Sequence, residues 1–474
     1  MASLLSLSMK MTPLLTSPMH SLRTLIAAFS IGTCVASPLT EDQILSLVKE
    51  TYPPLLISQI ENKLAQANKQ YSKGAFDTTL SVSGQIRPSN YYDGSNYELL
   101  LSSPFENSGA ELYGGYRLSN GYLPTYKRDL RTGDSGEYVV GFSFPLLQNF
   151  QIDNRRAQLK KASINESLTK HIVDLQLIEL SRAARTAYYG WIIAAQKEST
   201  AIELKELALT RQSLLSKEVE AGARPEIILI DNQRIVLNRD ILVRQAQRDL
   251  LNSNLSLGLF TPSLSLDSSI LPSTPPRIPL VTQNQFQSDL SYAMETHPEV
   301  LSLNQRQKSN QVDQELAQNM LLPQLDLTAE LNRSVREDSP KDIERNEIVA
   351  GLSLTFPLAR NQAKGQLKTA KQTQQQLSLK KQFALSKLNA DLNTAYNNLQ
   401  TNYKAWHLTE ESQTLALKLY KAEESLFDEG ASDLLKLQIR ENALVDAKMA
   451  TLKSLYQYLS SYSDYIAITA RDLQ

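Results

Sequence analysis

Apolar residues recur with helical spacing in two stretches of this chain, each beginning shortly after a glycine. After Gly222 they lie seven residues apart, at Leu229, Val236, Val243, Leu250 and Leu257. After Gly430 they follow a three- and four-residue spacing, at Val445, Met449, Leu452, Tyr456, Leu459 and Ile466. Such spacing is typical of the contact seam of coiled-coil helices. The sequence therefore predicts one helical hairpin in each half, turning at glycine.

The helix before each glycine is predicted to be unusually long. No proline interrupts the roughly 77 residues from Pro145 to Gly222, which span about 115 Å as a helix, or the roughly 73 residues up to Gly430. Each returning helix has only about 38 residues, and each half opens with a helix of about 34, bent at Pro53 and at Pro298. One opening helix stacked on one returning helix matches one long helix. We therefore expect a rod about 110 Å long, with a sheet at one end and the glycine turns at the other.

Strict alternation of apolar and polar residues predicts strands between the opening and long helices. It occurs at 76–83, 137–144, 325–332 and 347–356, which gives four strands per chain. Four strands cannot close a membrane barrel, so several chains would have to share one, and three chains would supply twelve strands.

The polar side of these strands carries small or charged residues. Asp77, Asp326 and Glu330 are the charged residues that we expect to line a water-filled lumen. A half-buried sheet in a soluble protein would show the same alternation. Asp326 and Glu330 lie on one strand face and could mimic the paired carboxylates of a catalytic site. We interpret these groups as solvated lumen residues.

Three short motifs occur twice, in the same order. They are Glu-Thr-Tyr-Pro at 50–53 and Glu-Thr-His-Pro at 295–298, Phe-Pro-Leu at 144–146 and 356–358, and Glu-Ala-Gly-Ala at 220–223 and Asp-Glu-Gly-Ala at 428–431. The pattern predicts two structural repeats, residues 37–260 and 281–474, each containing a helix, strands and a hairpin. Residues 261–280 are rich in proline and are expected to be the linker. His297, at the bend before Pro298, is interpreted as structural.

The first 36 residues are predicted to be a signal peptide. Arg23 precedes the apolar run from Leu25 to Val35, and small residues support cleavage after Ala36. A lipoprotein would instead keep Cys34 as its acylated first residue. The competing interpretation is a buried N-terminal helix of a cytosolic protein.

Composition excludes several functional classes. The 49 basic and 50 acidic residues give a net charge of −1, which indicates no nucleic-acid partner. One cysteine and four scattered histidines form no zinc motif, and there is no G-x-S-x-G or glycine-rich phosphate loop. We expect no enzyme activity, no cofactor and no metal. No apolar run after residue 36 is long enough for a polytopic helical membrane protein.

The first repeat contains an insert, residues 90–130, that the second lacks. It holds tyrosines at 91, 92, 97, 113, 116, 122 and 126. Tyrosine at this density is typical of an aromatic girdle at a membrane interface, of an external loop, or of a surface hairpin in a soluble domain.

Taken in order, these features resemble the TolC family of bacterial outer-membrane efflux proteins. The resemblance implies an α+β membrane protein, in which a long antiparallel α-helical coiled-coil barrel joins a shared twelve-stranded transmembrane β-barrel in a homotrimer. It implies a passive duct of a tripartite efflux pump or type I secretion system, for small molecules or proteins, located in the outer membrane with a periplasmic helical part. The linker and the C-terminal end would form an equatorial belt. The tips would dock to a periplasmic adaptor, which is coupled to an inner-membrane transporter.

The resemblance assigns adaptor docking to the two hairpin turns. Their residues are Gly222, Ala223, Arg224 and Pro225 in the first turn, and Gly430, Ala431, Ser432 and Asp433 in the second. Some members close the second tip with a tyrosine, an arginine and a ring of aspartates. Here Phe427, Ser432, Lys436 and Ile439 stand at those places, so an acidic gate is not expected. Phe427 and Lys436 remain the candidate gate residues, with Lys436 on the axis, directed outward, or paired with Asp433.

One function of another class remains open on sequence grounds. An exported periplasmic coiled-coil tether with a soluble β cap would share the helical repeats and the strands. Membrane fractionation separates the two, because only the duct is an outer-membrane trimer.

Overall fold

Helices and strands follow the same order in both halves of the computed structural model, which describes residues 39–88, 91–123, 132–262, 274–335 and 346–473. The first half contains α1 (Glu41–Thr51), α2 (Pro53–Lys73), the 3-10 turn η1 (Gly74–Phe76), β1 (Thr79–Arg87), β2 (Asp93–Pro104), β3 (Glu111–Tyr122), β4 (Glu137–Pro145), α3 (Asn154–Glu220) and α4 (Glu226–Gly258). The second contains α5 (Gln283–Thr296), α6 (Pro298–Asn319), β5 (Gln324–Ser334), β6 (Asn346–Thr355), α7 (Asn361–Asp428), α8 (Leu434–Thr469) and the 3-10 turn η3 (Arg471–Leu473). The predicted signal peptide, Cys34, Tyr126 and residues 263–273 of the linker lie outside the described residues.

Proline divides each opening helix where the sequence predicted a bend. Tyr52 and His297 precede the prolines and adopt ψ angles of 115° and 129°, away from the helical region. The proline ring disfavours helical geometry in the preceding residue, so the chain bends there and the next helix begins at the proline. The predicted bends are confirmed.

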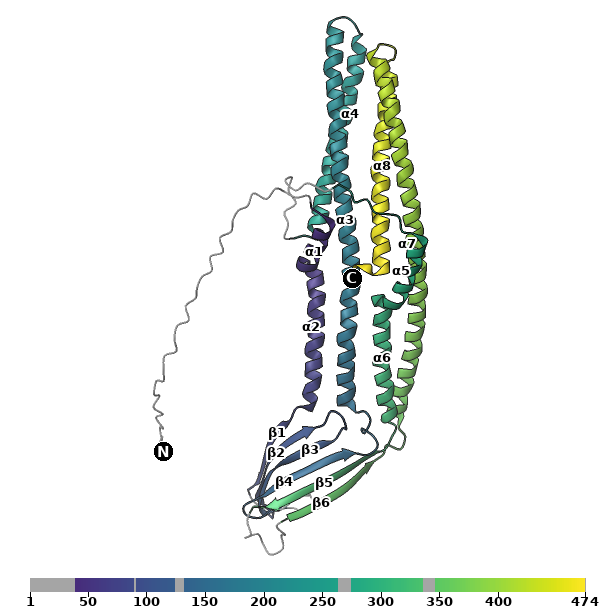
Figure 1. Ribbon diagram of the computed structural model, residues 1–474. Coiled ribbons are helices and arrows are strands. Elements are labelled where there is room, and N and C mark those ends of the chain that lie inside the picture. Colours follow the sequence, from purple (N-terminus) through teal and green to yellow (C-terminus); the bar gives the residue numbers. More distant parts are fainter. Residues whose placement is uncertain (1–38, 89–90, 124–131, 263–273, 336–345, 474) are drawn as a thin grey trace, which may run out of the picture.

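The helices form a rod in which short helices are stacked along long ones. Figure 1 shows α2 and α4 following one another along α3, and α6 and α8 along α7, with the sheet at one end and both hairpin turns at the other. The long helices α3 and α7 have 67 and 68 residues, or about 100 Å each. The stacking inferred from helix lengths is confirmed.

The largest core lies at the waist of the rod, where α1 and α5 pack against the middle of the long helices. Its fully buried side chains include Ile44, Tyr188, Tyr189, Ile192, Leu392, Leu399, Leu459 and Tyr465. Ion pairs join α1 and η3 to α3 here, because Arg185 of α3 lies 2.6 Å from Glu41 of α1 and 2.6 Å from Asp472 of η3. Linker residues also join the core, since Tyr458 donates a hydrogen bond to the carbonyl of Ile278.

The six described strands form one antiparallel sheet in the order β1-β2-β3-β4-β5-β6. The prediction of four strands per chain is therefore wrong, because β2 and β3 lie in the tyrosine-rich insert. Apolar and polar residues do not alternate strictly in either strand. The run Leu99-Leu100-Leu101 interrupts the alternation in β2, and Gly114-Gly115 interrupts it in β3. The first predicted strand also begins later than expected, because Gly74–Phe76 form the turn η1.

Cross-strand pairing places most large apolar side chains on one face of the sheet, and much of that face is exposed. Its exposed members are Leu80, Val82 and Ile86 on β1, Tyr97, Leu99 and Leu101 on β2, Leu112 on β3, Tyr138, Val140 and Phe142 on β4, Leu331 on β5, and Ile348, Leu352 and Leu354 on β6. The opposite face is mostly polar. In the single chain, the apolar face has no covering layer among the described residues.

Candidate functional site

Both hairpin turns have the same backbone geometry at the end of the rod. Gly222 and Gly430 have φ angles of 73° and 75°. In the first turn, the Gly222 N–H donates to Val219 O at 2.9 Å and the Ala223 N–H donates to Glu218 O at 2.8 Å. The second turn repeats both bonds, from Gly430 to Phe427 and from Ala431 to Leu426, at 3.0 and 2.8 Å. This is the Schellman motif, which favours glycine because φ is positive.

Arg224 joins the two turns. Its Nε lies 2.6 Å from Glu218 Oε2 in its own hairpin, and its guanidinium lies 4.5 Å from the centroid of the Phe427 ring in the other. Phe427 is 8% exposed and packs in a tip core with Leu215, Tyr420, Leu434, Leu437 and Leu444. The candidate gate residue Phe427 is thus a buried contact between hairpins in the single chain.

Lys436, the other candidate gate residue, pairs with the N-cap of its own helix. Its backbone N–H donates to Asp433 Oδ1 at 2.9 Å, and its Nζ lies 3.3 Å from Asp433 Oδ2. These contacts, the backbone hydrogen bond first, hold the pKa of Asp433 below its usual range. Of the other second-turn residues, Ser432 donates to Glu423, which Arg440 approaches at 3.8 Å. The sequence left three placements open for the Lys436 side chain: on the axis, directed outward, or paired with Asp433. In the single chain it is paired with Asp433.

A buried charge cluster below the tips was not predicted. Glu441 of α8 is 1% exposed, and its carboxylate lies 2.6 Å from Arg211 of α3 and 3.3 Å from Arg239 of α4. Arg239 also donates to Asn442 Oδ1 at 2.8 Å. The cluster therefore fixes α8 of one hairpin to both helices of the other. The sequence held a signal for it, because Glu441 follows Leu434 and Leu437 and precedes Leu444 at seam spacing.

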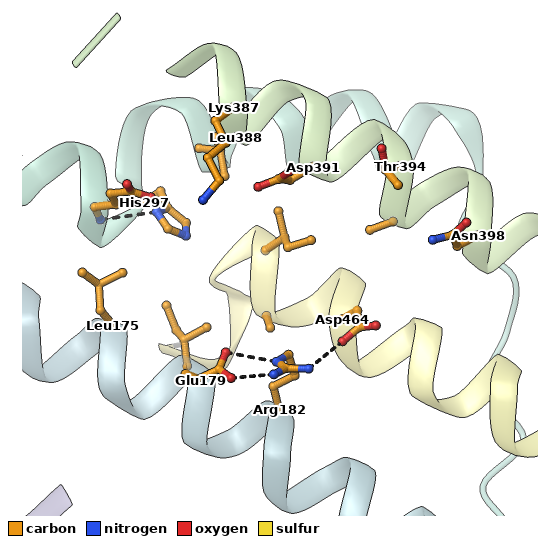
Figure 2. Close-up of a pocket in the computed structure, with 15 residues that line it drawn as sticks. Leu175, Glu179, Arg182, His297, Lys387, Leu388, Asp391, Thr394, Asn398 and Asp464 are labelled. Atoms are coloured by element: carbon orange, nitrogen blue, oxygen red, sulfur yellow. Dashed lines mark hydrogen bonds and ion pairs between the residues drawn. The ribbon is translucent and has the colours of Figure 1, made fainter. Parts of the chain in front are cut away.

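At the waist, an open pocket lies between α3, α6, α7 and α8 (Figure 2). One wall carries an ion-pair chain in which Arg182 contacts Glu179 at 2.5 Å and Asp464 at 3.0 Å. His297 forms part of another wall, is 8% exposed, and accepts a hydrogen bond at Nδ1 from the N–H of Glu299. Burial lowers the pKa of His297, and only a ring with Nδ1 unprotonated can accept this bond.

We predict that His297 makes stability fall in mild acid. In the unfolded chain the pKa of His297 is near 6.5. Between that pH and the lower pKa of the folded state, the unfolded chain binds a proton at His297 and the folded chain does not. The free energy of unfolding therefore decreases as pH falls from about 6.5 to the lowered folded pKa, and His297→Asn should reduce this slope. Denaturant titrations at pH 5 to 8 measure it, with His407→Asn, at an exposed site on α7, as the matched control. Equal slopes in His297→Asn and the parent would contradict the prediction.

The predicted lumen residues lie at the sheet, in different settings. The Glu330 carboxylate of β5 accepts hydrogen bonds from two residues of β3, Arg117 Nη1 at 2.6 Å and Tyr113 Oη at 3.0 Å. Asp326 accepts a hydrogen bond from Gln324 at 2.7 Å. Asp77 lies between η1 and β1, so its predicted place on a strand is wrong. Glu330 is therefore part of an ion-pair network and not an isolated solvated group.

Two kinds of feature are absent from the described residues. None of the helices in the described parts of the chain has the length and apolar character of a membrane-spanning segment. Within the same residues, no group of three or more His, Cys, Asp or Glu side chains is arranged to hold a metal ion.

Comparison with protein families gives a match in the second half. Residues 290–469, from α5 to the end of α8, match the family described as outer membrane efflux protein. The second half of the chain is therefore similar to outer membrane efflux proteins. The predicted resemblance is thereby confirmed. A comparison of the sequence with curated proteins finds no match.

Solved structures share the fold of this chain over nearly its whole length. The outer membrane channel CmeC of Campylobacter jejuni matches with a TM-score of 0.62 at 14% identity, covering 97% of this chain and 94% of its own. The outer membrane channel MtrE of Neisseria gonorrhoeae, in its open state, matches with a TM-score of 0.63 at 14% identity, covering 92% and 89%. The outer membrane protein VceC of Vibrio cholerae gives 0.63 at 13% identity, covering 91% and 96%. At these identities the similarity is one of fold.

Proposed function

We propose that this protein is an efflux duct, a passive channel in the outer membrane formed by three copies of the chain. One observation carries the proposal: the apolar face of the sheet extends across all six strands and is exposed, as a lipid-facing surface would be. An exposed apolar face of this extent in a folded protein marks a membrane or protein contact. The strands have 9 to 12 residues, close to the length that a tilted strand needs to cross a bilayer.

Aromatic residues lie at both ends of this surface. At the end far from the helices, Tyr92 stacks on Tyr122 at 5.4 Å and Tyr91 packs against both rings. At the helical end, Phe144 and Phe150 have ring centroids 5.8 Å apart, and Phe105 is exposed. Two aromatic girdles flanking an apolar band are typical of outer-membrane barrels. The tyrosine-rich insert contributes the outer girdle.

Unpaired apolar residues on the sides of the rod support assembly from copies of this chain. On α4, large apolar side chains are exposed at Ile227, Ile230, Leu237, Ile241, Leu251 and Leu255. On α7, at the opposite flank, they are exposed at Leu379, Phe383, Leu408, Leu415 and Leu419. Different surfaces on two flanks fit a head-to-tail contact, which closes into a ring when the rotation between copies allows. The family relationship favours a ring of three.

The proposed duct runs from the barrel through the helical rod to the tips. The exposed turns, with Gly222 and Gly430 at their apices, would dock to a periplasmic adaptor coupled to an inner-membrane transporter. Their surroundings are mixed in charge, with Glu218 and Arg224 in one turn and Asp433 and Lys436 in the other. Such surfaces suit polar, separable contacts. Small molecules or proteins would pass without a specific binding pocket.

Fractionation of cells that express the full chain tests the proposal. We expect the protein in the outer membrane, extracted only by detergent, with a native mass of three chains. A monomer in the soluble periplasmic fraction would overturn the duct and favour the tether. An inner-membrane protein of known location and a soluble periplasmic enzyme serve as fractionation controls.

A further inference from the structure

We infer that the barrel has eighteen strands, because the inserted β2–β3 hairpin is part of the wall and three copies of a six-stranded sheet close together. The inference rests on the proposed trimer. The family resemblance implies twelve strands, so the insert would give this duct a wider barrel than that pattern. The partner at each edge of the sheet is a second copy of this chain.

The hairpin lies inside the hydrogen-bonded ladder of the sheet. All nine residues of β1 pair with β2, from Thr79 with Ser102 to Arg87 with Gly94. On the other side, β3 pairs with β4 from Glu111 with Ser143 to Arg117 with Glu137. A twelve-stranded trimer would require β1 to leave β2 and pair with β4. Both ladders of the insert would then have to be broken or moved out of the wall.

The hairpin also continues the two faces of the neighbouring strands. Cross-strand pairs place Leu99 beside Val82 of β1, and Leu112 beside Phe142 of β4, on the exposed apolar face. Glu98 and Arg117 lie on the opposite, polar face. A hairpin folded into the lumen or projecting beyond the membrane would not need a lipid-like face in register with its neighbours.

An ion-pair network on the polar face ties the insert to the second half of the chain. Arg117 of β3 lies 2.7 Å from Glu98 of β2 and 2.6 Å from Glu330 of β5. Tyr113 of β3 also donates to Glu330, at 3.0 Å. The network therefore spans β2 to β5, passing over the intervening strand β4.

Gly141 of β4 makes this crossing possible. It pairs with Tyr113 on one side and with Glu330 on the other. A Cβ at Gly141 would lie 2.5 Å from Tyr113 Cζ, so the tyrosine ring occupies the space above the glycine. Because β4 carries a glycine at this position, Tyr113 of the insert can pass over β4 and donate its hydrogen bond to Glu330 of β5.

The two free edges of the sheet are suited to pair between copies. Among the described strands, β1 and β6 each have a partner on one side only. Because β1 leaves the helical end and β6 returns to it, β6 of one copy would run antiparallel to β1 of the next. Open edges in lipid leave backbone groups unpaired, at several kcal/mol each, and closure removes them. Barrel diameter grows roughly linearly with strand number, so eighteen strands give about 1.5 times the diameter of twelve.

Engineered disulfides distinguish the two barrels in the full-length protein. In a Cys34→Ser background, Ser83→Cys on β1 is combined in turn with Val349→Cys, Gly351→Cys or Ser353→Cys on β6, which scans the seam register. A parallel set combines Ser83→Cys with Val139→Cys or Ser143→Cys on β4. The pair Ser81→Cys and Leu100→Cys, which are β1–β2 partners, is the positive control. All these positions lie on the polar face.

Eighteen strands predict that a β1–β6 pair shifts the band on a non-reducing gel from one chain to three, while β1–β4 pairs form no disulfide. A native trimer in which β1–β4 pairs form disulfides within one chain would overturn the eighteen-stranded barrel and leave the trimer standing. A native mass of one or two chains would overturn the trimer itself. The β1–β2 control must form its disulfide within one chain, and its failure would also overturn the inferred wall.

Discussion

Replacing Glu441 with alanine should destabilise the tip half of the rod by about 3–5 kcal/mol, the largest stability effect that we predict for a single substitution. The carboxylate is almost fully buried and binds two arginines, Arg211 and Arg239, that are themselves 8% and 9% exposed. Its removal leaves two buried cations near each other with no compensating charge. The arginines belong to the first hairpin and the carboxylate to the second, so the two hairpins should separate.

Two controls isolate the charge effect of Glu441→Ala. Combining Arg211→Met, Arg239→Met and Glu441→Leu removes the whole cluster and keeps its volume, and such replacements are often neutral or stabilising. Glu203→Ala removes an exposed partner of Lys448, at 3.3 Å, and should have little effect. Denaturant unfolding gives the stability, and hydrogen exchange along α3, α4 and α8 locates the loss. If Glu441→Ala were no worse than Glu203→Ala, the cluster would not hold the hairpins together.

Separation of the hairpins would have a functional consequence in the proposed duct. A trimer of Glu441→Ala should show a higher resting conductance in a planar bilayer than the parent protein, because the tips would no longer be held against each other. The triple variant with an apolar cluster should return conductance toward the parent value. If conductance rises in Glu441→Ala and returns in the triple variant, the cause is the unpaired buried arginines, which displace the tips, and not the loss of the Glu441 carboxylate itself.

The helical part of this fold was readable from the sequence because its determinants are local. The Tyr52-Pro53 and His297-Pro298 bends follow from proline geometry, and the turns at Gly222 and Gly430 follow from the need for positive φ. The predicted helix lengths then indicated that one opening helix and one returning helix stack along each long helix. None of these steps required knowledge of distant contacts.

The strands and the site depended more on contacts between distant residues. Alternation identified β1, β4, β5 and β6, but it is interrupted in β2 and β3, where Leu100 and Leu101 pair with Gly115 and Gly114. Gly141 is small because Tyr113 crosses it to reach Glu330, which lies 217 residues away from that tyrosine in the chain. Sequence spacing likewise gave no indication that Arg224 stacks on Phe427. Glu441 was not predicted either, although a charge at a seam position is visible in the heptad pattern.

Replacing Gly430 with tryptophan should abolish export while leaving a trimer in the outer membrane. The turn lies at the end of the rod, and a Cβ at Gly430 would meet no atom within 4 Å, so the side chain would project from the proposed docking surface. The positive φ of 75° adds a backbone cost of about 1–2 kcal/mol for most residues. Substrate export by cells measures the effect, and native mass measures assembly.

Asparagine at Gly430 separates the two causes, because it tolerates positive φ better than most residues and still adds a side chain to the surface. If docking needs close approach of the backbone, Gly430→Asn should also impair export, although less than Gly430→Trp. If the turn alone matters, Gly430→Asn should export normally. Gly365→Trp is the matched control, because Gly365 also has no atom within 4 Å of its Cβ position but lies on α7, far from the tips. Normal export by Gly430→Trp would show that the adaptor does not dock at this turn, and the partner surface would then have to lie elsewhere on the rod.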